Sequence, residues 1–509
     1  MAFERIQFSP LADLAESLDF AWQRFHASQG EMELPDVIDS AEVLYQWPKY
    51  RSYLVEKIDS NAYYPGYVEV VDLPKDELTV RPLARLTLED RLFYEAHVFS
   101  MAIRIDSEIS RSVYSYRWSI FKNDLRRPIG SWVNMQKTGR KIQSANPSFL
   151  LAKTDVSSFY ENVDIDVLIQ ELSNLTENVK GLARLRSFLQ AFQQMNHVWG
   201  LPQGSDASGI LANLYLVPVD RVIQATALRH LRYSDDIYIF GPEKRGLREC
   251  LLEVNRTLRG RHLSMSGHKT KIMRPVEAAT YFGDMEKDAI RYKVDIASDM
   301  ALAEVRDFFA RATKKDSDRD IRFSLNQFKH LNSPFAMDWV VQNFERFPHM
   351  AQDFVAYLEF FPICALDMVH KFCTKAISER TMVSYPYAEL HIFGLMMRQR
   401  IFDKQVHGAA WDILRNRNEE TFLREYAARY VGLNAQPGDG ALLRQEFRRD
   451  PSTALRRVLL VAIYETRHDS TAWFDQAAGA VPDLRWICDY LKSKPKIPLP
   501  PPYRRVSSD

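Results

Sequence analysis

Cysteines are scarce in this sequence, and none is placed to build a metal centre or a disulfide framework. The 509-residue chain has only 4 cysteines, namely Cys250, Cys364, Cys373 and Cys488. They lie far apart, and no Cys-x-x-Cys pair or neighbouring histidine set accompanies them. Zinc sites and disulfide frameworks require closer spacing. The spacing therefore excludes both and predicts a reducing, cytoplasmic environment.

Long apolar segments are also missing. The N-terminal stretch is interrupted by Glu4, Arg5 and Asp13, which argues against a signal segment. The longest aliphatic run, Val458 to Tyr464, is far shorter than the roughly 20 residues that cross a bilayer. We therefore expect no membrane partner. With 46% apolar and 26% charged residues, the chain has the composition of a soluble protein with two or three domains.

The chain as a whole has no basic excess, since 67 basic residues face 66 acidic ones. A local excess exists between Arg111 and Lys141, where eight basic residues accompany one acid, Asp124. Tyrosines and tryptophans lie among these cations. One interpretation is a solvated basic face. We favour a phosphate-binding surface, because aromatics among cations suit single-stranded nucleic acid.

The character of the sequence changes near residue 300. Before it, we predict strands over residues 148–159, 230–240 and 280–292, and a helix over 207–220. After it, helical stripes such as Ile321, Leu325 and Phe328 recur with short breaks. The predicted units are an N-terminal segment packing on the next unit (1–80), a mixed α/β (α+β) unit (81–295), an all-α unit of HEAT-like helical pairs (296–493) and an extended Pro-rich tail (494–509).

Three segments carry the chemistry: Lys153–Tyr160, Gly200–Ser205 and Tyr233–Phe240. The last predicts a hairpin with Asp235 and Asp236 at its tip. Two such charges about 4 Å apart repel by roughly 4 kcal/mol at an effective dielectric near 20. An acidic turn is the simpler interpretation, but Asp155 at the end of another strand adds a third carboxylate. Three carboxylates suit two Mg²⁺ ions and in-line phosphoryl transfer.

These segments resemble the palm motifs of reverse transcriptases. They are similar to the Asp-x-x-x-x-aromatic box, the Pro-Gln-Gly box and the Tyr-x-Asp-Asp box, in the family's order. Residues 263–271 and 281–283 resemble the next two palm elements, and Asp90–Arg91 and 113–117 resemble finger elements. The resemblance covers roughly residues 80–290. It implies a palm-and-fingers polymerase domain, followed here by the all-α HEAT-like domain.

The resemblance also implies roles for individual residues. Asp155, Asp235 and Asp236 would be catalytic, and would hold two Mg²⁺ ions together with the carbonyl group of Val156. Gln203, Arg117 and Lys269 would contact the incoming nucleotide. Tyr160 would lie under the sugar, where a ring leaves little room for a 2′-hydroxyl. The expected substrates are therefore deoxynucleoside triphosphates, and the expected product is DNA.

The layout narrows the resemblance further. The sequence has no retron Val-Thr-Gly signature and no HNH-like cluster, and it is similar to the phage abortive-infection reverse transcriptases of bacteria. That group implies antiphage defence, a homo-oligomer and template-free synthesis of single-stranded DNA attached to a protein hydroxyl. Candidate priming residues are Tyr45, Tyr50 and Tyr53, with Tyr63, Tyr64 and Tyr67 as further candidates. Two alternatives stay open: a templated RNA-directed DNA polymerase with a cognate RNA, and a binding scaffold whose palm no longer reacts.

Overall fold

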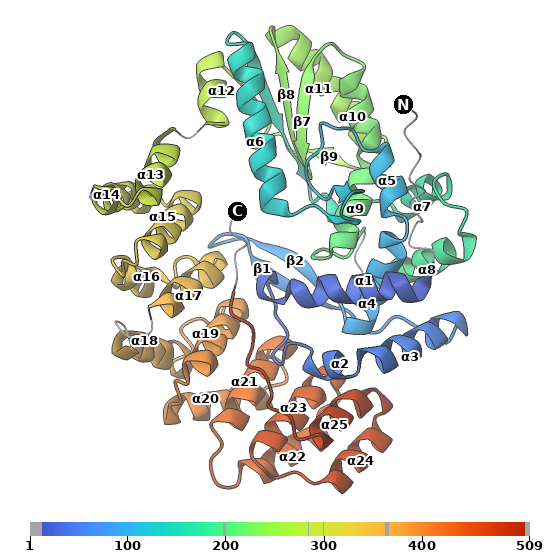
Figure 1. The fold of residues 1–509 in the computed structure, drawn as a ribbon, viewed down its shortest axis with the longest axis vertical. Coiled ribbons are helices and arrows are strands. Elements are labelled where there is room, and N and C mark those ends of the chain that lie inside the picture. The colour runs from blue at the N-terminus through green and yellow to red at the C-terminus, as the bar shows by residue number, and fades with distance from the viewer. Residues whose placement is uncertain (1–12, 197–199, 284, 299, 362–365, 504–509) are drawn as a thin grey trace.

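The computed structural model describes residues 13–196, 200–283, 285–298, 300–361 and 366–503 (Figure 1). Its N-terminal part contains helices and one long hairpin. These elements are α1 (Leu14–Ala27), η1 (Gln29–Glu31), α2 (Ala41–Tyr45), α3 (Trp47–Asp59), β1 (Glu69–Pro74) and β2 (Val80–Arg85). The two strands pair antiparallel, with Glu69 opposite Arg85. The hairpin lies between the polymerase-like region and the helices near the C-terminus (Figure 1).

The finger elements follow the hairpin. They are α4 (Leu88–Phe99), α5 (Ala102–Glu108), β3 (Trp118–Ser119), β4 (Asp124–Leu125) and α6 (Pro128–Ala145). Thr87 caps α4, because its hydroxyl accepts a hydrogen bond of 3.1 Å from the Asp90 N–H. The N-terminal segment packs here through Phe20, whose ring centroid is 5.4 Å from that of Phe99.

A four-stranded antiparallel sheet forms the centre of the palm, in the order β10-β5-β8-β7. The strands are β5 (Leu150–Thr154), β7 (Arg229–Tyr233), β8 (Asp236–Gly241) and β10 (Lys271–Met273). Alternate side chains bury both faces: Ile237 and Ile239 belong to one hydrophobic core, whereas Tyr238 and Phe240 belong to another. The strands predicted over 148–159 and 230–240 are confirmed.

Helices and short strands surround this sheet. They are β6 (Val156–Ser157), η2 (Tyr160–Asn162), α7 (Ile165–Ser173), α8 (Val179–Asn196), α9 (Asp206–Tyr215), α10 (Val217–Gln224), α11 (Lys244–Arg259), β9 (Ser264–Met265) and α12 (Pro275–Tyr281). The helix predicted over 207–220 is present as α9 and α10. Pro218 occupies the first turn of α10, where its missing N–H costs nothing.

The ribbon predicted over residues 280–292 is wrong. This stretch ends α12 and then enters α13 (Met285–Asp295). The aromatic pair Tyr281 and Phe282 suggested a strand, but Ile290 and Val294 are spaced one helical turn apart and are both buried. The helical period of these apolar residues decides the local structure.

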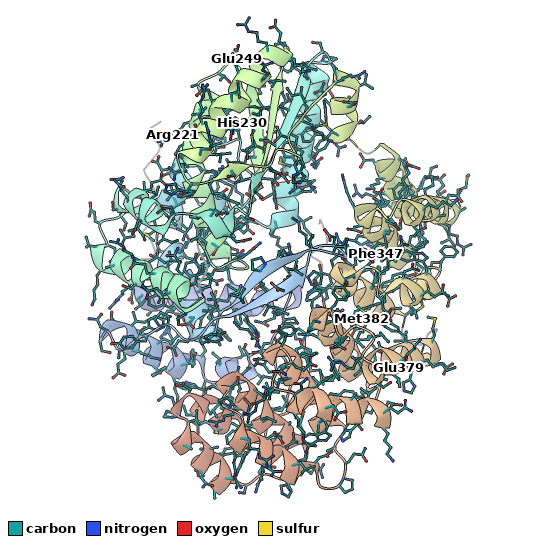
Figure 2. The ribbon with its side chains drawn as sticks, turned by 180° about the vertical axis from the view of Figure 1, so that it is seen from behind. Arg221, His230, Glu249, Phe347, Glu379 and Met382 are labelled. Carbon is teal, nitrogen blue, oxygen red and sulfur yellow. The ribbon has the colours of Figure 1, made fainter. Side chains whose placement is uncertain are left out.

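An all-helical region completes the chain, as predicted from the sequence. Besides α13 it contains α14 (Ala301–Lys314), α15 (Asp318–His330), α16 (Met337–Asn343), η3 (Pro348–Met350), α17 (Ala351–Phe360), α18 (Leu366–Ser378), α19 (Pro386–Gln399), α20 (Lys404–Arg415), α21 (Thr421–Leu433), α22 (Asp439–Arg449), α23 (Thr453–Glu465), α24 (Thr471–Ala480), η4 (Pro482–Leu484) and α25 (Arg485–Lys492). Neighbouring helices stack along an arc (Figure 1). Phe347 and Met382 lie in its core, whereas Glu379 is exposed (Figure 2). The HEAT-like character of this arc stays a prediction.

The Pro-rich tail is extended through residue 503, and it packs on the helical region. Its backbone carbonyl groups accept hydrogen bonds from the helices: Tyr464 donates to Pro495 at 2.9 Å and Arg429 donates to Pro498 at 3.2 Å. The frequent prolines prevent the tail from forming a helix, so these carbonyls have no helical partner and can accept hydrogen bonds from the neighbouring helices. Within the described part of the chain, no helix has both the length and the apolar character that a membrane crossing requires.

Candidate active site

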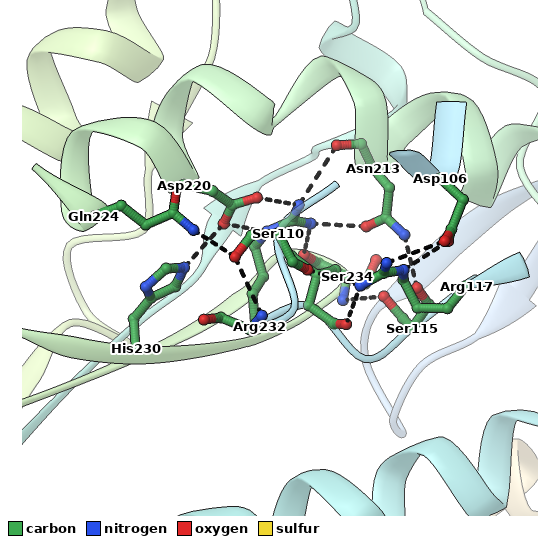
Figure 3. A network of polar contacts seen from close by, with 12 residues as sticks. Asp106, Ser110, Ser115, Arg117, Asn213, Asp220, Gln224, His230, Arg232 and Ser234 are labelled. Carbon is green, nitrogen blue, oxygen red and sulfur yellow. Dashed lines mark hydrogen bonds and ion pairs between the residues drawn. The ribbon is translucent and has the colours of Figure 1, made fainter. Parts of the chain in front are cut away.

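The turn between β7 and β8 carries two of the predicted acids. Tyr233 and Asp236 are the last paired residues, so Ser234 and Asp235 form the tip. Ser234 has a left-handed backbone, with φ of 55°. Its N–H donates to Ser115 Oγ at 2.7 Å, and its carbonyl oxygen accepts from Arg232 Nη1 at 3.0 Å. Both backbone groups of the turn residue are therefore held by the protein (Figure 3).

A buried ion pair supports this turn. Arg232 is fully buried, and its guanidinium donates to both carboxylate oxygens of Asp220, at 2.9 and 2.7 Å. Arg232 also donates to Asn213 Oδ1 at 2.8 Å, and Asn213 donates to the Ser115 carbonyl at 2.7 Å (Figure 3). Sequence reasoning missed these residues. The signal was Arg232 between Leu231 and Tyr233 in a predicted strand, because an arginine there is rarely buried without a partner.

Asp155 and Asp235 come together although they are far apart in the sequence. Asp155 follows β5, the strand beside β8, and its carboxyl group lies within hydrogen-bonding reach of Asp235. Burial, together with the negative charge of Asp155, raises the pKa of Asp235 to about 7. Near neutral pH Asp235 is therefore partly protonated. A cation between them would relieve the same repulsion.

Lys269 provides a positive charge at this pair. Its Nζ lies 2.5 Å from Asp155 Oδ2, and the Ser266 N–H donates to the Asp155 carbonyl at 2.8 Å. The loop after β9 thus fixes both the backbone and the side chain of Asp155. The predicted contact of Lys269 with the nucleotide stays a prediction. In this structure its ammonium group neutralises a carboxylate.

Asp236 differs from the other two acids. It lies on the same face of β8 as Tyr238, which is opposite Lys153, and its Oδ1 is 3.1 Å from Lys153 Nζ. Among the residues that the structure describes, no group of three or more His, Cys, Asp or Glu side chains converges on one point. The structure therefore brings two of the three predicted acids together and pairs the third with a lysine.

The donor set at the tip fits a hard divalent cation. Asp155 and Asp235 supply carboxylate oxygens, the ligand type that Mg²⁺ prefers. The Ser266 N–H donates to the Asp155 carbonyl, so these two residues form a hydrogen-bonded pair of the antiparallel ladder. The next pair, Val156 with Met265, is therefore of the non-hydrogen-bonded type. In such a pair the Val156 carbonyl faces away from β9. Asp155, Asp235 and the Val156 carbonyl could hold the cation.

Tyr160 joins two of the sequence motifs to the turn. Its hydroxyl lies 3.4 Å from Ser234 Oγ, and burial raises its pKa to about 12, so the group is neutral. Its backbone carbonyl accepts from the Leu201 N–H at 2.8 Å. Gly200 has φ of 78°, and an added Cβ would meet the Tyr160 oxygen at 2.0 Å. The Pro-Gln-Gly box can therefore approach Tyr160 this closely only with glycine at that position.

Gln203 lies on the loop that leads into α9. Its carbonyl oxygen accepts a hydrogen bond of 3.0 Å from the Ala84 N–H of β2. Gly204, with φ of 108°, presses against Leu83, whose Cδ1 would be 2.3 Å from an added Cβ. The loop is thus seated on the β1–β2 hairpin, a contact that the sequence did not predict.

Arg117 is paired with other groups of the fingers. The side chain is buried, and its guanidinium donates to Asp106 Oδ1 at 2.6 Å and Oδ2 at 3.1 Å. It also donates to the carbonyl groups of Ser110 and Val113, at 2.7 and 3.0 Å. These contacts hold Arg117 within the fingers, and its predicted contact with the nucleotide stays a prediction. The exposed cations of the same basic segment are Arg111, Lys122, Arg126, Arg127, Lys137, Arg140 and Lys141.

The predicted priming tyrosines are not beside the acids. Tyr45 is 57% exposed, whereas Tyr50 is buried with its ring centroid 5.0 Å from that of Trp486 on α25. Tyr53 packs on the same tryptophan at 5.6 Å. Their helices, α2 and α3, lie on the other side of α1 and α4 from the palm strands (Figure 1). Among the further candidates, Tyr64 and Tyr67 are strongly exposed.

Comparisons with known proteins found one matching family and several similar solved structures. No curated protein matches the chain. The solved structures similar to it include apo telomerase from Candida tropicalis, with 11% identity, a TM-score of 0.33 and coverage of 77% of this chain and 72% of that chain. Another is telomerase from Candida albicans in complex with a TWJ fragment of telomeric RNA, with 11% identity, a TM-score of 0.31 and coverage of 72% and 70%. Residues 74–292 match the model of the reverse transcriptase (RNA-dependent DNA polymerase) family, so this part of the chain is similar to a reverse-transcriptase domain.

Proposed function

We propose that this protein is a DNA polymerase of the reverse-transcriptase type that acts in antiphage defence. The observation that carries the proposal is the meeting of Asp155 and Asp235 beside Tyr160, inside the region that matches the reverse transcriptase family. A buried acid pair at the tip of a hairpin, within a polymerase-like domain, is the arrangement that nucleotidyl transfer through Mg²⁺ requires.

The charged residues at the tip have different proposed roles in nucleotidyl transfer. Bound Mg²⁺ would lower the pKa of the attacking hydroxyl group and neutralise charge on the leaving pyrophosphate. Asp155 and Asp235 would hold Mg²⁺ at the strand ends. Asp236 would attract the cation less strongly, because Lys153 already neutralises its carboxylate. Lys269, which is 43% exposed, can move from Asp155 toward a triphosphate when a cation arrives.

Tyr160 would decide which sugar is accepted. Its hydroxyl lies 3.4 Å from Ser234 Oγ, so its ring borders the turn that carries Asp235. A ring at this place leaves little room for a 2′-hydroxyl. Deoxynucleoside triphosphates are therefore the proposed substrates and single-stranded DNA the proposed product.

Synthesis without a template, a covalent link to a protein hydroxyl and assembly as a homo-oligomer are parts of the same proposal. They are supported by the layout of the chain, in which a reverse-transcriptase domain precedes a long helical region. Tyr45, Tyr64 and Tyr67 are the candidates whose side chains are exposed enough to reach an active site of a second copy or of the same chain after rearrangement.

A labelling experiment tests the proposal. Purified protein is incubated with labelled deoxynucleotide and Mg²⁺, without primer or template, and separated under denaturing conditions. We expect covalent label on the wild type, no label on Asp155→Asn or Asp235→Asn, and reduced label on Asp236→Asn. An unlabelled wild type that also fails with added RNA and primer would support a non-catalytic scaffold instead.

The alternative is a templated RNA-directed DNA polymerase. It is favoured by the matched family, which is described as RNA-dependent DNA polymerase. Under this alternative, incorporation requires added RNA and the product sequence is complementary to it. Sequencing the product from the same reaction separates the two candidates.

A further inference from the structure

The β1–β2 hairpin connects the nucleotide-facing loop to another part of the molecule. At one end, Ala84 donates its N–H to the Gln203 carbonyl at 3.0 Å, and Leu83 packs against Gly204. Gly204 has φ of 108°, a backbone conformation that glycine adopts readily and other residues avoid, so it can lie against Leu83 at this close distance. The position of β2 therefore sets the position of Gln203.

At the other end, the hairpin is tied to α21 of the helical region. Arg85, the last residue of β2, donates from Nη1 to Glu69 at 2.9 Å and from Nη2 to Glu425 on α21 at 2.6 Å. Glu69 in turn accepts from the N–H of Thr421 at 3.1 Å, at the N-terminus of α21. Two carboxylates and one guanidinium thus join the first residue of β1, the last of β2 and one helix.

This connection is buried and charge-assisted, so it is stiff. The Glu425 side chain is 5% exposed, and the Glu69 side chain is 19% exposed. Burial works against the charge of Arg85, but the two carboxylates outweigh it and raise the pKa of the guanidinium. Breaking one arm leaves a partner buried without its counter-charge, which is far more costly than losing a surface pair.

We propose that Arg85 and Glu425 are positioning residues for the polymerase reaction, through which α21 of the helical region sets the Gln203 loop. The line of contacts runs from Glu425 to Arg85, along one residue of β2 to Ala84, and across a backbone hydrogen bond to Gln203. The helical region is then a part of the nucleotide site and not a separate appendage. This inference rests on the proposed function, since Gln203 faces a nucleotide only if the site polymerises.

A second ion pair between the same two regions provides a matched control. Arg457 on α23 donates to both oxygens of Glu42 on α2, at 2.6 and 3.0 Å, and the Glu42 side chain is 6% exposed. Like Glu425, Glu42 is a buried acid that joins the helical region to the N-terminal part of the chain. Unlike Glu425, it does not contact the hairpin.

The test compares Glu425→Gln with Glu42→Gln in the full chain. For Glu425→Gln we expect the KM for deoxynucleotide to rise about tenfold while kcat stays within about twofold, and for Glu42→Gln we expect neither value to change. Leu83→Ala, which keeps both ion pairs, should raise KM as Glu425→Gln does. Equal changes in the two glutamine variants would show that the contact only holds the regions together.

Hydrogen exchange gives a readout that does not depend on activity. The Ala84 amide should exchange about tenfold faster in Glu425→Gln than in the wild type and at the wild-type rate in Glu42→Gln. If the wild type incorporates no nucleotide, the proposed function fails, but this measurement still decides whether α21 holds the loop. Unchanged exchange at Ala84 in Glu425→Gln would overturn the inference.

Discussion

Arg232 donates a hydrogen bond of 3.0 Å from Nη1 to the carbonyl oxygen of Ser234, the residue that precedes Asp235. The same guanidinium forms a two-armed ion pair with Asp220, and neither side chain reaches water. Moving the turn would leave an N–H group of the buried guanidinium without its acceptor, which costs roughly 1–3 kcal/mol. The tip of the hairpin is therefore preorganised by a buried ion pair.

The other backbone group of Ser234 offers a test of this preorganisation. Ser115→Ala removes the acceptor for the Ser234 N–H but leaves Arg232 and Asp220 intact. We expect kcat to fall about fivefold to tenfold, because one hydrogen bond contributes roughly 1 kcal/mol, while the free energy of unfolding changes by about as much. Steady-state kinetics measures the first quantity and urea unfolding the second. Ser119→Ala, in β3, is the control, and an equal loss of kcat there would contradict the assignment.

Tyr160 gives a prediction on sugar selection. Tyr160→Ala should admit ribonucleotides, because it removes the ring that borders the turn at Ser234. Tyr160→Phe keeps the ring and should keep the selection. The measurement is the ratio of kcat/KM for a deoxynucleotide to that for its ribonucleotide, which we expect to fall at least about tenfold in the alanine variant alone. A fall in both variants would assign the selection to the hydroxyl group.

The parts of the site that the sequence predicted are those set by local chemistry. Ser234 and Asp235 suit a two-residue turn, and the apolar residues on either side suit strands, so the hairpin follows from the segment itself. Asp155 could be added to the predicted site because it ends another predicted strand and would supply a third carboxylate. Burial of both sheet faces likewise follows from the apolar residues of β8.

The parts that the sequence did not predict are contacts between distant segments. The partner of Arg232 is 12 residues away, that of Asp155 is 114 away, and that of Arg85 on α21 is 340 away. Charge pairing of this kind leaves no periodic pattern in the sequence, so any of the 66 acids could have been the partner of Arg232 or Arg85. The error at residues 280–292 has a different cause, since a short aromatic run fits a strand or a helix until its neighbours decide.

Phe121 tests the proposed phosphate-binding surface. It lies between β3 and β4 with its side chain 98% exposed, and Lys122, Arg126 and Arg127 are exposed near it. Stacking of a base on an exposed ring is worth about 1–3 kcal/mol, so Phe121→Ser should weaken binding of single-stranded oligothymidine at least about fivefold. Fluorescence anisotropy of a labelled oligonucleotide measures the change.

A matched control for Phe121 lies at the tip of the other hairpin. Leu78 is 90% exposed, but its neighbours are the acids Asp76 and Glu77. Leu78→Ser should therefore leave DNA binding unchanged. If both variants bind as the wild type does, the basic segment is only a solvated face, which is the simpler interpretation of its sequence.

The buried pair of Glu465 and Arg429 makes the stability of the helical region depend on pH. Burial outweighs the attraction of Arg429 and raises the pKa of Glu465 from 4.5 to about 7. Between these values the folded protein retains a proton that the unfolded chain has released, so stability falls as the pH rises through this window. The shift corresponds to about 3 kcal/mol of folding stability, which is fully present below pH 4.5 and lost above pH 7. Glu465→Gln cannot ionise and should lack this part of the pH dependence. Urea unfolding of the two proteins at several values between pH 5 and 8 measures the difference, and parallel curves would show that Glu465 is ionised throughout.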